Sequence, residues 1–558
     1  MKTRIVSLVI VLMMLLCSIA AAEEPVNPKG VFPIVDEPIT LTVWCNLPAQ
    51  RAENIETNDA TLYLEEKTGI HLVWRKIGTN EAAEQLRVMM AADTDLPDII
   101  MTANTGAIIT NEQVNMYGMQ GLLLPLNDYI EKYGDSWNTQ MDLVPWARSQ
   151  VKAPDGNIYG LGGVSDGAYH MSLYQKFYVN QKWLDKLGLE KPTTIDEFYD
   201  MLVAFRDQDP NGNGVKDEVP LSGSIGKEYI RTTLDCFLMN AFQYSTSWEK
   251  EWLYLEDDKV ACGAITEAYR EGLRWFKKLY DEGLMDKEIF INTQESMKLL
   301  SGAADGNKLG SFTAMFPVAG VATDNPEIND YVALSPLEGP NGRCSPDNPQ
   351  GRASVTGYMI THNCKYPEAA FRLGDFLMTL ASTEDGNFDN MTMIYGKEGI
   401  GWSRPNEGDK GLDGKPARFR ILPGKQLDNG EYSRYDICWD EIGPWTKPSA
   451  ERNSTAMDPV AGYNIEQILY DETRDVYEPF RVKKSIPSLV FSSEDAEAMA
   501  DLIVNIQNYG QEAIAAFVTS QWSLDNDWDN YVQTMYDYGL QELIDIYERA
   551  YETYKASF

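Results

Sequence analysis

Histidine is scarce in this chain, and the metal sites that depend on it are not indicated. The 558 residues include only three histidines, His71, His170 and His362. They form no H-E-x-x-H pattern and no close pair, so a histidine-bound metal is disfavoured. The chain also lacks a G-x-x-x-x-G-K-[ST] loop for cradling phosphates. A nucleotide-hydrolysing site of that type is therefore not indicated.

Closely spaced cysteine pairs are absent too. The chain has seven cysteines, and none of them forms a C-x-x-C pair, so a zinc site is disfavoured. Six would remain after removal of the leader described below: Cys45, Cys236, Cys262, Cys344, Cys364 and Cys438. Their spacing does not decide whether they form disulfides.

An excess of basic residues is also missing. The chain has 48 Lys and Arg against 84 Asp and Glu, a formal net charge of −36. Such a chain has no basic field to replace the counterions of nucleic acid, so nucleic-acid binding is disfavoured. Binding to an anionic membrane surface is disfavoured for the same reason. The charge chiefly indicates solubility and names no partner.

Long apolar runs are confined to the N-terminus, which reads as a secretory signal peptide over residues 1–22. Lys2 and Arg4 precede an apolar run from Ile5 to Leu16, and Ala20-Ala21-Ala22 offers a cleavage site. No later run approaches the roughly 20 apolar residues that span a bilayer. We expect a protein exported to the periplasm or the exterior. Lipidation of Cys17 is the alternative, although leucines rather than small residues precede it.

A polar window from Asp209 to Pro220, DPNGNGVKDEVP, predicts a calcium site. Calcium takes six to eight oxygen ligands, and alternating Asp and Asn side chains in a curled loop can supply them. Gly214 stands at the sixth position, where the chain turns sharply. Pro220 occupies the twelfth position in place of a bidentate Glu, so the ligand set has to close early. The expected ligands are Asp209, Asn211, Asn213, the Val215 carbonyl, Asp217 and Glu218.

The site lacks an obvious nucleophile or base, so a bound calcium would be structural. A metal-free polar turn is the alternative, because Asn-Gly pairs are strong turn formers.

The chain is long enough for more than one domain, and its pattern predicts alternating strands and helices. Residues 39–47, 70–77 and 96–102 have strand character, and residues 80–93 have helical composition. This rhythm favours parallel strands in an α/β layer. Residues 121–134 read as a turn into a helix. Residues 151–164 read as a β-hairpin built on Asp155-Gly156.

A second region of α/β character is expected from about residue 176. Thr194 and Glu197 form a capping box at the start of a helix. Further elements are predicted along the rest of the chain: helices at 264–282 and 364–380, a strand at 354–361, an irregular excursion at 403–430 and a helical end at 493–556.

Several stretches resemble the extracellular solute-binding proteins of sugar ABC importers, in particular the large alginate- and oligosaccharide-binding lipoprotein subfamily. They include LEEKTGIHLVWRKI, LPDIIMT, GLLLPLNDYIEKYG, YPEAAFRLGDFLMT and, most specifically, the block from Trp183 to Pro220. The likeness extends over essentially all of the chain after the leader. In that family the equivalent Asn-Gly loop holds calcium, in agreement with the window above.

The resemblance implies an α/β fold of the type II periplasmic-binding-protein kind, with two lobes, hinge crossovers and a ligand cleft. Lobe 1 would contain residues 23–163 and 353–402. Lobe 2 would contain residues 164–352 and, with less support from the pattern, 403–558.

The resemblance also implies a monomeric, non-catalytic receptor that captures a sugar or oligosaccharide by lobe closure and delivers it to the membrane subunits of an ABC permease. Sugar sites combine aromatic platforms with polar hydrogen-bonding side chains. The candidate ligand-binding residues are Trp44, Asn46, Asn104, Tyr169, Phe316, Tyr358, Tyr395, Glu398 and Trp402.

Two other functions stay open at this stage. An exported carbohydrate-active enzyme, a glycoside hydrolase or lyase, needs only two suitably spaced carboxylates, which this acidic chain could supply. A binding module that serves a membrane sensor would use the same surfaces as a transport receptor.

Overall fold

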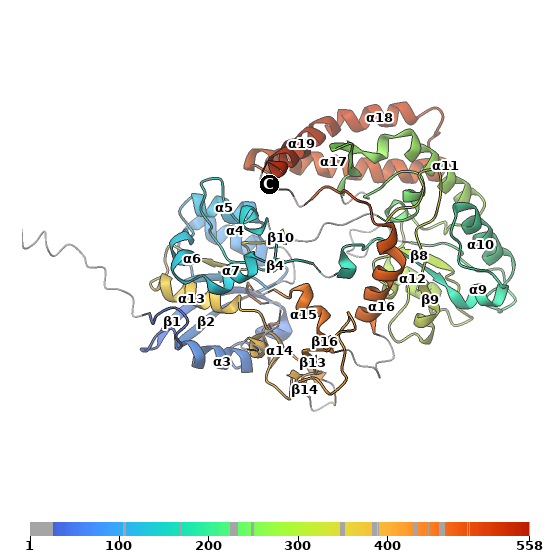
Figure 1. Cartoon of the computed structure of the whole chain (residues 1–558). Coiled ribbons are helices and arrows are strands. Elements are labelled where there is room, and N and C mark those ends of the chain that lie inside the picture. The colour runs from blue at the N-terminus through green and yellow to red at the C-terminus, as the bar shows by residue number, and fades with distance from the viewer. Residues whose placement is uncertain are drawn as a thin grey trace, which may run out of the picture. The chain divides into compact units, whose positions relative to one another are not determined.

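The computed structural model describes residues 26–556, with gaps at 104–107, 145, 168, 224–232, 247–249, 346–351, 382–387, 389, 428–429, 431, 441, 445, 457–463, 488 and 490. The chain forms two compact units (Figure 1). Unit 1 contains the chain up to Asp166 together with Gly351–Ala456, and unit 2 contains Gly167–Gln350 together with Met457–Phe558. Mixed helices and sheets in both units confirm the α/β class expected from the sequence.

The main sheet of unit 1 has the strand order β11-β3-β1-β2. Strands β1 (Ile39–Leu47), β2 (Ile70–Gly78) and β3 (Ile99–Met101) run parallel, as the sequence rhythm predicts. Strand β11 (Tyr358–Ile360) returns from the second segment and pairs antiparallel with β3. The second half of β1 is buried on both faces, as expected for a central strand of a covered sheet.

Helices of unit 1 alternate with these strands, and glycine and proline residues mark where some of them end or begin. Helix α3 ends at Gly69, whose φ of 73° suits glycine, and a Cβ there would lie 2.5 Å from the Val35 carbonyl oxygen. Helix α13 (Pro367–Leu377) begins with a proline and is buried over most of its length, because it packs on β11, α6 (Asn127–Tyr133) and α7 (Asp135–Met141). The helices of this unit are α2 (Ala49–Ala52), α3 (Asp59–Thr68), α4 (Ala82–Ala92), α5 (Asn111–Met119), α6 (Asn127–Tyr133), α7 (Asp135–Met141), α8 (Ala147–Gln150), α13 (Pro367–Leu377), α14 (Met391–Tyr395) and α15 (Ser449–Asn453).

Residues 403–456 belong to unit 1, which corrects the expectation that everything after residue 402 lies in the second lobe. The segment builds a small sheet, β12-β13-β16, and a hairpin, β14-β15. It is also tied to the first segment of unit 1. The Arg51 guanidinium donates to the Cys438 carbonyl at 3.1 Å, and the indole N–H of Trp439 donates to Thr61 at 2.8 Å. The strands concerned are β12 (Trp402–Ser403), β13 (Phe419–Ile421), β14 (Lys425–Gln426), β15 (Tyr432–Ser433) and β16 (Thr455–Ala456).

The expected β-hairpin at 151–164 is wrong in its strands but right in its turn. Gly156 adopts a φ of 85°, and the Ala153 N–H donates to the Asn157 carbonyl at 2.8 Å. Apart from this hydrogen bond, the described residues of the two arms form no strand pairing with each other. Instead Leu161 exchanges backbone hydrogen bonds with Tyr358 of β11, so the available edge of the sheet takes the segment. It then forms β4 (Val164–Ser165), which pairs with β10 (Arg352–Ala353).

Unit 2 is built on an antiparallel sheet with the order β8-β5-β9, formed by β5 (Lys176–Asn180), β8 (Ser311–Ala314) and β9 (Tyr331–Ala333). The predicted capping box is present at the start of α10 (Ile195–Asp207): Thr194 Oγ1 accepts from the Glu197 N–H at 3.1 Å, and Glu197 accepts from the Thr194 N–H at 3.2 Å. The elements around this sheet are α9 (Gln181–Leu187), α10 (Ile195–Asp207), the hairpin β6 (Leu253–Glu256) and β7 (Lys259–Cys262), α11 (Glu267–Asp281) and α12 (Gln294–Ser301).

A buried lysine joins the start of unit 2 to its second segment. Lys176 of β5 is fully buried, and its ammonium donates to Thr473 Oγ1 at 2.7 Å and to the Leu469 carbonyl at 3.2 Å. Both acceptors belong to helix α16 (Ile465–Glu472) and the π-helical turn that continues it. Burial lowers the pKa of Lys176, while the Glu472 carboxylate acts in the opposite direction.

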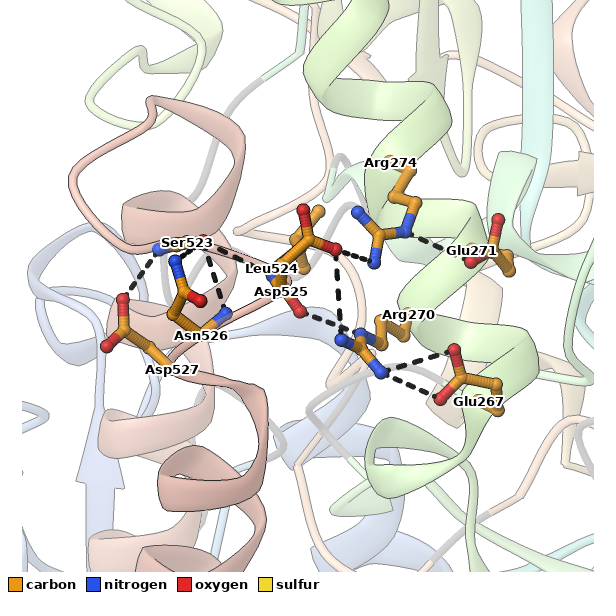
Figure 2. A network of polar contacts seen from close by, with 9 residues as sticks. All are labelled: Glu267, Arg270, Glu271, Arg274, Ser523, Leu524, Asp525, Asn526 and Asp527. Carbon is orange, nitrogen blue, oxygen red and sulfur yellow. Dashed lines mark hydrogen bonds and ion pairs between the residues drawn. The ribbon is translucent and has the colours of Figure 1, made fainter.

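The C-terminal part of unit 2 is helical, as predicted, with α17 (Ser493–Val518), α18 (Trp528–Asp537) and α19 (Leu540–Lys555) beside α11 (Figure 1). Figure 2 shows how the turn before α18 is held on α11. Arg270 donates to the Leu524 carbonyl at 2.7 Å, and Arg274 pairs with Asp525 at 2.5 Å. None of the described helices is both long enough and apolar enough to traverse a bilayer.

Glu251 is a buried carboxyl group between the hairpin region and the terminal helices. Its residue is 3% exposed, and its oxygens accept from Gln507 at 2.7 Å and from the Tyr547 hydroxyl at 3.1 Å. Burial raises the pKa of Glu251 to about 7, against an ordinary value of 4.5. A carboxyl whose folded pKa is raised binds its proton more tightly in the folded state. Its contribution to stability is therefore present below pH 4.5 and is lost as the pH rises through about 7.

We predict that Glu251→Gln increases the free energy of unfolding at pH 8 by about 2–3 kcal/mol, because it removes the burial cost of the charge. The gain should shrink towards zero near pH 5, where the wild-type carboxyl is protonated. Denaturant unfolding at the two pH values measures the effect. Glu512→Gln, on an exposed position of α17, serves as the matched control, and an equal gain there would contradict the assignment to burial.

Candidate functional site

A hollow of unit 1 lies at the carboxyl ends of β1 and β2. Because the two strands are parallel and in register, Asn46 lies opposite Ile77 and Leu47 opposite Gly78, so both strands end at the same edge of the sheet. A pocket of about 380 Å³ lies there. Its lining comes from both strand ends: Leu47, Pro48, Ala49, Ala52, Lys76, Ile77, Gly78, Thr79, Asn80 and Glu81.

Two polar groups at this edge are buried without a hydrogen-bond partner on the protein. Asn46 is fully buried, and its Oδ1 accepts from the Ala103 N–H at 2.9 Å, but its Nδ2 donates to no protein atom. The hydroxyl of Thr79 is likewise buried and unpartnered. A buried polar group without a partner costs about 1–3 kcal/mol. Polar groups that remain unpartnered at the edge of a pocket are suited to form hydrogen bonds with a polyhydroxylated ligand.

The rim of this pocket is held by a buried arginine. Arg51 of α2 is 8% exposed, its guanidinium donates to the Cys438 carbonyl at 3.1 Å, and it lies 5.0 Å from the centroid of the Tyr435 ring. Asn54 adds a 2.7 Å hydrogen bond to Asp436. The segment 403–456 therefore fixes α2, whose Ala49 and Ala52 line the pocket.

A second polar and aromatic cluster of unit 1 surrounds Trp402. Its ring stacks on Phe388 at 5.2 Å between centroids and 5° between planes, and the Arg404 guanidinium lies 4.0 Å from the Phe388 centroid. Glu398, which is exposed, pairs with Arg404 at 3.5 Å. The indole N–H of Trp402 is buried and has no partner. The structure thus brings together two predicted ligand-binding residues, Glu398 and Trp402.

Three other candidates of unit 1 are core residues in this structure. Trp44 is 3% exposed in the central strand β1. Tyr358 is fully buried, and its hydroxyl donates to the Ala370 carbonyl at 2.6 Å. Tyr395 is also buried, and its hydroxyl donates to Glu451 at 3.0 Å. Their side chains are occupied by packing and by internal hydrogen bonds.

The remaining candidates lie in unit 2 or outside the described residues. Tyr169 is half-buried at the start of unit 2, where its ring contacts Tyr470 and its hydroxyl donates to Glu478 at 3.3 Å. Burial, with Glu478 nearby, raises the pKa of Tyr169 to about 12, so its hydroxyl stays protonated at neutral pH. Phe316 is half-buried against the core of unit 2. Asn104 lies outside the described residues.

The predicted calcium loop follows α10 in unit 2 and is held by its neighbours. The Lys186 ammonium donates to the Asp209 carbonyl at 2.9 Å, and the Asp209 carboxylate accepts the backbone N–H of Gly214 at 3.1 Å. Asp217 pairs with Lys308 at 2.8 Å, an interaction that lowers the pKa of Asp217. Within the described chain, no three His, Cys, Asp or Glu side chains are grouped so that they could hold a metal ion as they stand.

The chemistry of the loop nevertheless fits a hard cation. Its donors are all oxygens, from three carboxylates, two amides and a carbonyl, as calcium prefers. Both carboxylate oxygens of Glu218 are buried without a partner. Burial raises the pKa of Glu218, as do the nearby Asp209 and Asp217 carboxylates. The backbone amides of Glu218 and Asn211 lower the pKa of Glu218 and so oppose this rise. Neither amide makes a hydrogen bond of ordinary geometry to the Glu218 carboxylate.

One short string has the form of a serine-hydrolase motif but not its setting. Residues 163–167 read G-V-S-D-G, a G-x-S-x-G string. Ser165 stands in the two-residue strand β4, opposite Arg352, and not on a turn between a strand and a helix. The six cysteines of the described chain are free thiols.

Residues 49–383 match the family of bacterial extracellular solute-binding proteins. The chain belongs to this family. This solute-binding protein is 25% identical, over 506 residues, to the fructooligosaccharide ABC transporter substrate-binding protein FusA of Streptococcus pneumoniae serotype 4, covering 88% of this chain and 86% of FusA.

Solved structures agree on the fold of this solute-binding protein. The structure of S. pneumoniae FusA with kestose superposes with a TM-score of 0.70 at 24% identity, covering 93% of this chain and 100% of FusA. An EF-hand mutant of FusA with fructo-nystose gives the same TM-score at 22% identity, with the same coverage. The alginate-binding protein AlgQ2 without calcium ion gives 0.61 at 21% identity, covering 94% of this chain and 100% of AlgQ2.

Thr79 was not among the residues predicted from the sequence, although a signal was present. It is a polar residue directly after the strand predicted at 70–77, at the carboxyl edge of a parallel sheet, where ligands of α/β proteins commonly bind. The sequence analysis favoured aromatic residues, but Trp44 and Tyr358, which lie in strands, proved to be core residues.

We predict that Thr79→Val stabilises the ligand-free protein by about 1 kcal/mol, because it replaces a buried unpartnered hydroxyl with a methyl group of similar size. Thr79→Ser, which keeps the hydroxyl, should show no such gain. Chemical denaturation of both variants beside wild type measures the difference. A loss of stability in the valine variant would mean that the hydroxyl has a partner in the ligand-free protein.

Proposed function

We propose that this solute-binding protein captures a neutral sugar or oligosaccharide outside the cytoplasmic membrane and delivers it to the membrane subunits of an ABC importer. The observation that carries this proposal is membership of the solute-binding family together with similarity to FusA along most of both chains. Closure of the two units on the ligand, as implied by the family, is part of the proposal. The strongly acidic chain supports a neutral ligand, because an anionic one would meet long-range repulsion.

The proposed role is binding without catalysis. Thr79 lines the pocket in unit 1, and the buried amide of Asn46 lies next to it at the same sheet edge; a hydroxyl and an amide suit recognition of sugar hydroxyls. Its lysine, Lys76, is paired with Glu56 at 2.9 Å. We assign sugar contacts to Asn46 and Thr79 at the sheet edge, to Glu398 and Trp402, and in unit 2 to Tyr169 and Phe316. Asn104 remains a predicted contact, and the three buried candidates would support these positions from the core.

Calcium is proposed as a structural ion of the loop in unit 2. Asp209, Asn211, Asn213, Asp217 and Glu218 would hold it with the Val215 carbonyl. When bound, the ion would neutralise the three loop carboxylates. The unpartnered Glu218 oxygens support this proposal from the structure. Two proteins of similar fold also support it, because FusA was solved as an EF-hand mutant and AlgQ2 was solved without calcium ion.

The proposed location is outside the cytoplasm, after removal of residues 1–22. A lipid anchor on Cys17 remains the alternative to a free protein. Delivery to a permease is favoured over service to a sensor, because the relative matched along most of its length is a transporter component.

A binding experiment tests the function. Purified protein should show a rise in melting temperature with kestose or with another neutral oligosaccharide, and the sugar should be recovered unchanged after overnight incubation. Thr79→Val should bind the same sugar about five- to tenfold more weakly, since it loses a hydrogen bond worth roughly 1–1.4 kcal/mol. Sugar products in the incubation would contradict a binding role. The absence of a shift with any neutral oligosaccharide would contradict the proposed ligand class.

The calcium proposal predicts a specific phenotype for Glu218→Gln. Calcium at about 100 times its dissociation constant should stabilise wild type by about 2.7 kcal/mol, and the variant should lose most of this gain. In chelator the variant should melt at or above the wild-type temperature, because the Glu218 carboxylate is unpartnered and lies near two other acids. Glu256→Gln is the control. Equal melting of wild type with calcium and with chelator would overturn the proposal.

A further inference from the structure

Lys308 lies against the calcium loop from a segment far along the chain. Its ammonium is 2.8 Å from Oδ2 of Asp217 and 3.0 Å from Oδ2 of Asp305. Its backbone is fixed on both sides: the Val219 N–H donates to the Lys308 carbonyl at 2.7 Å, and the Lys308 N–H donates to the Leu300 carbonyl at 3.0 Å. Only the side chain is therefore free to change partners.

Both carboxylate oxygens of Asp217 accept hydrogen bonds from protein groups. Besides the Lys308 ammonium, it accepts from Nδ2 of Asn213 at 3.1 Å and from Nδ2 of Asn211 at 3.3 Å. Glu218, the next residue, accepts from none. In the loop, the Asp217 carboxylate is thus paired with a cation of the protein, whereas the Glu218 carboxylate is not. A calcium ion held by both carboxylates would share Asp217 with a cation that is already in place.

We propose that Lys308 is an internal counter-cation of the calcium loop, which holds Asp217 in the calcium-free protein and releases it when the ion binds, so that Lys308 determines the affinity for calcium. This inference rests on the calcium site proposed above. A divalent ion and the ammonium repel each other at the separations that one shared carboxylate would impose. Asp305 already accepts from the ammonium, so the side chain has a second partner when it leaves Asp217.

The burial of the pair separates it from the ordinary surface ion pairs of this chain. The side chains of Lys308 and Asp217 are 23% and 21% exposed, whereas those of Lys484 and Asp258, in the same unit, are 64% and 50% exposed. A partly buried pair is screened less by solvent and salt. Its rupture is therefore a measurable part of the free energy of calcium binding.

Calcium titration of charge variants by isothermal calorimetry tests the proposal. Lys308→Met should bind calcium about fivefold more tightly than wild type, since the competing cation is gone. Lys308→Arg, which keeps the charge, should stay within about twofold. Lys484→Met removes a lysine from the exposed pair and should also leave the affinity unchanged. Equal or weaker binding by Lys308→Met, or the same gain in Lys484→Met, would overturn the proposal.

A variant of the second partner should act in the opposite direction. Asp305→Asn removes the carboxylate to which Lys308 would retreat, so calcium should bind about two- to threefold more weakly. Tighter binding would contradict the exchange of partners. If Lys308→Met does not fold in chelator, Lys308→Gln keeps a donor to Asp217 without the charge. It should show a smaller gain in affinity, and no gain would count against the proposal.

The outcomes separate this inference from the two proposals that precede it. If wild type binds no calcium, the calcium site and the role of Lys308 both fall. If wild type binds calcium and Lys308→Met does so no more tightly, only the role of Lys308 falls. Sugar binding, measured with kestose at saturating calcium, should be the same in Lys308→Met and wild type, so failure of the sugar proposal leaves this test intact.

Discussion

The parallel pairing of β1 with its two neighbours is the constraint on which the proposed sugar site depends. The strand pairs with β2 along its whole length and with β3 near its end, and its final residues are buried on both faces. A slip of one residue would exchange the two faces of the strand and is therefore strongly opposed. This register places Asn46 and the end of β2 at one edge, and the pocket exists because both strands stop there together.

A comparable dependence links the loop of unit 2 to its sheet. The chain leaving the loop pairs with the segment before β8 at Val219 and meets β8 itself at Ser222, whose N–H donates to the Ser311 carbonyl at 2.9 Å. Strand β8 in turn pairs with β5. The charges of the loop therefore act on a segment that continues directly into the core of unit 2. A structural ion at this position would stabilise the junction of α10 with the sheet, with no need for direct contact with a sugar.

Local patterns in the sequence predicted the elements that local chemistry specifies. A β-rich run predicted β1 and alternation predicted β2. The Thr194–Glu197 spacing predicted the start of α10, and the spacing of Asp and Asn identified the loop after it. Long-range pairing was not predictable in the same way. Leu161 pairs with β11 and not with its own hairpin arm, and residues 403–456 join unit 1 through bonds such as Arg51 to the Cys438 carbonyl.

The candidate site shows the same division. The sequence does not distinguish a tyrosine that faces a ligand from one that faces the core when it lies near the end of a strand. Tyr358 is buried because β11 is covered on both faces, a fact that depends on segments elsewhere in the chain. Lys308 carries no local signal, since its partner Asp217 lies in a different part of the sequence. Thr79 could have been found by position alone, from the rule that parallel strands present ligands at their carboxyl ends.

The interleaving of the two segments of unit 1 has a consequence for the order in which the protein acquires structure. Strand β11 and helix α13 arise after the whole first segment of unit 2 has been synthesised. Until then β3 has a free edge and the core of unit 1 lacks the buried face of α13. Pairings between distant parts of a chain form slowly, because loop closure has to precede them. A chain that stays incompletely folded for so long would suit the proposed export, because a polypeptide crosses a membrane most easily while it is still extended.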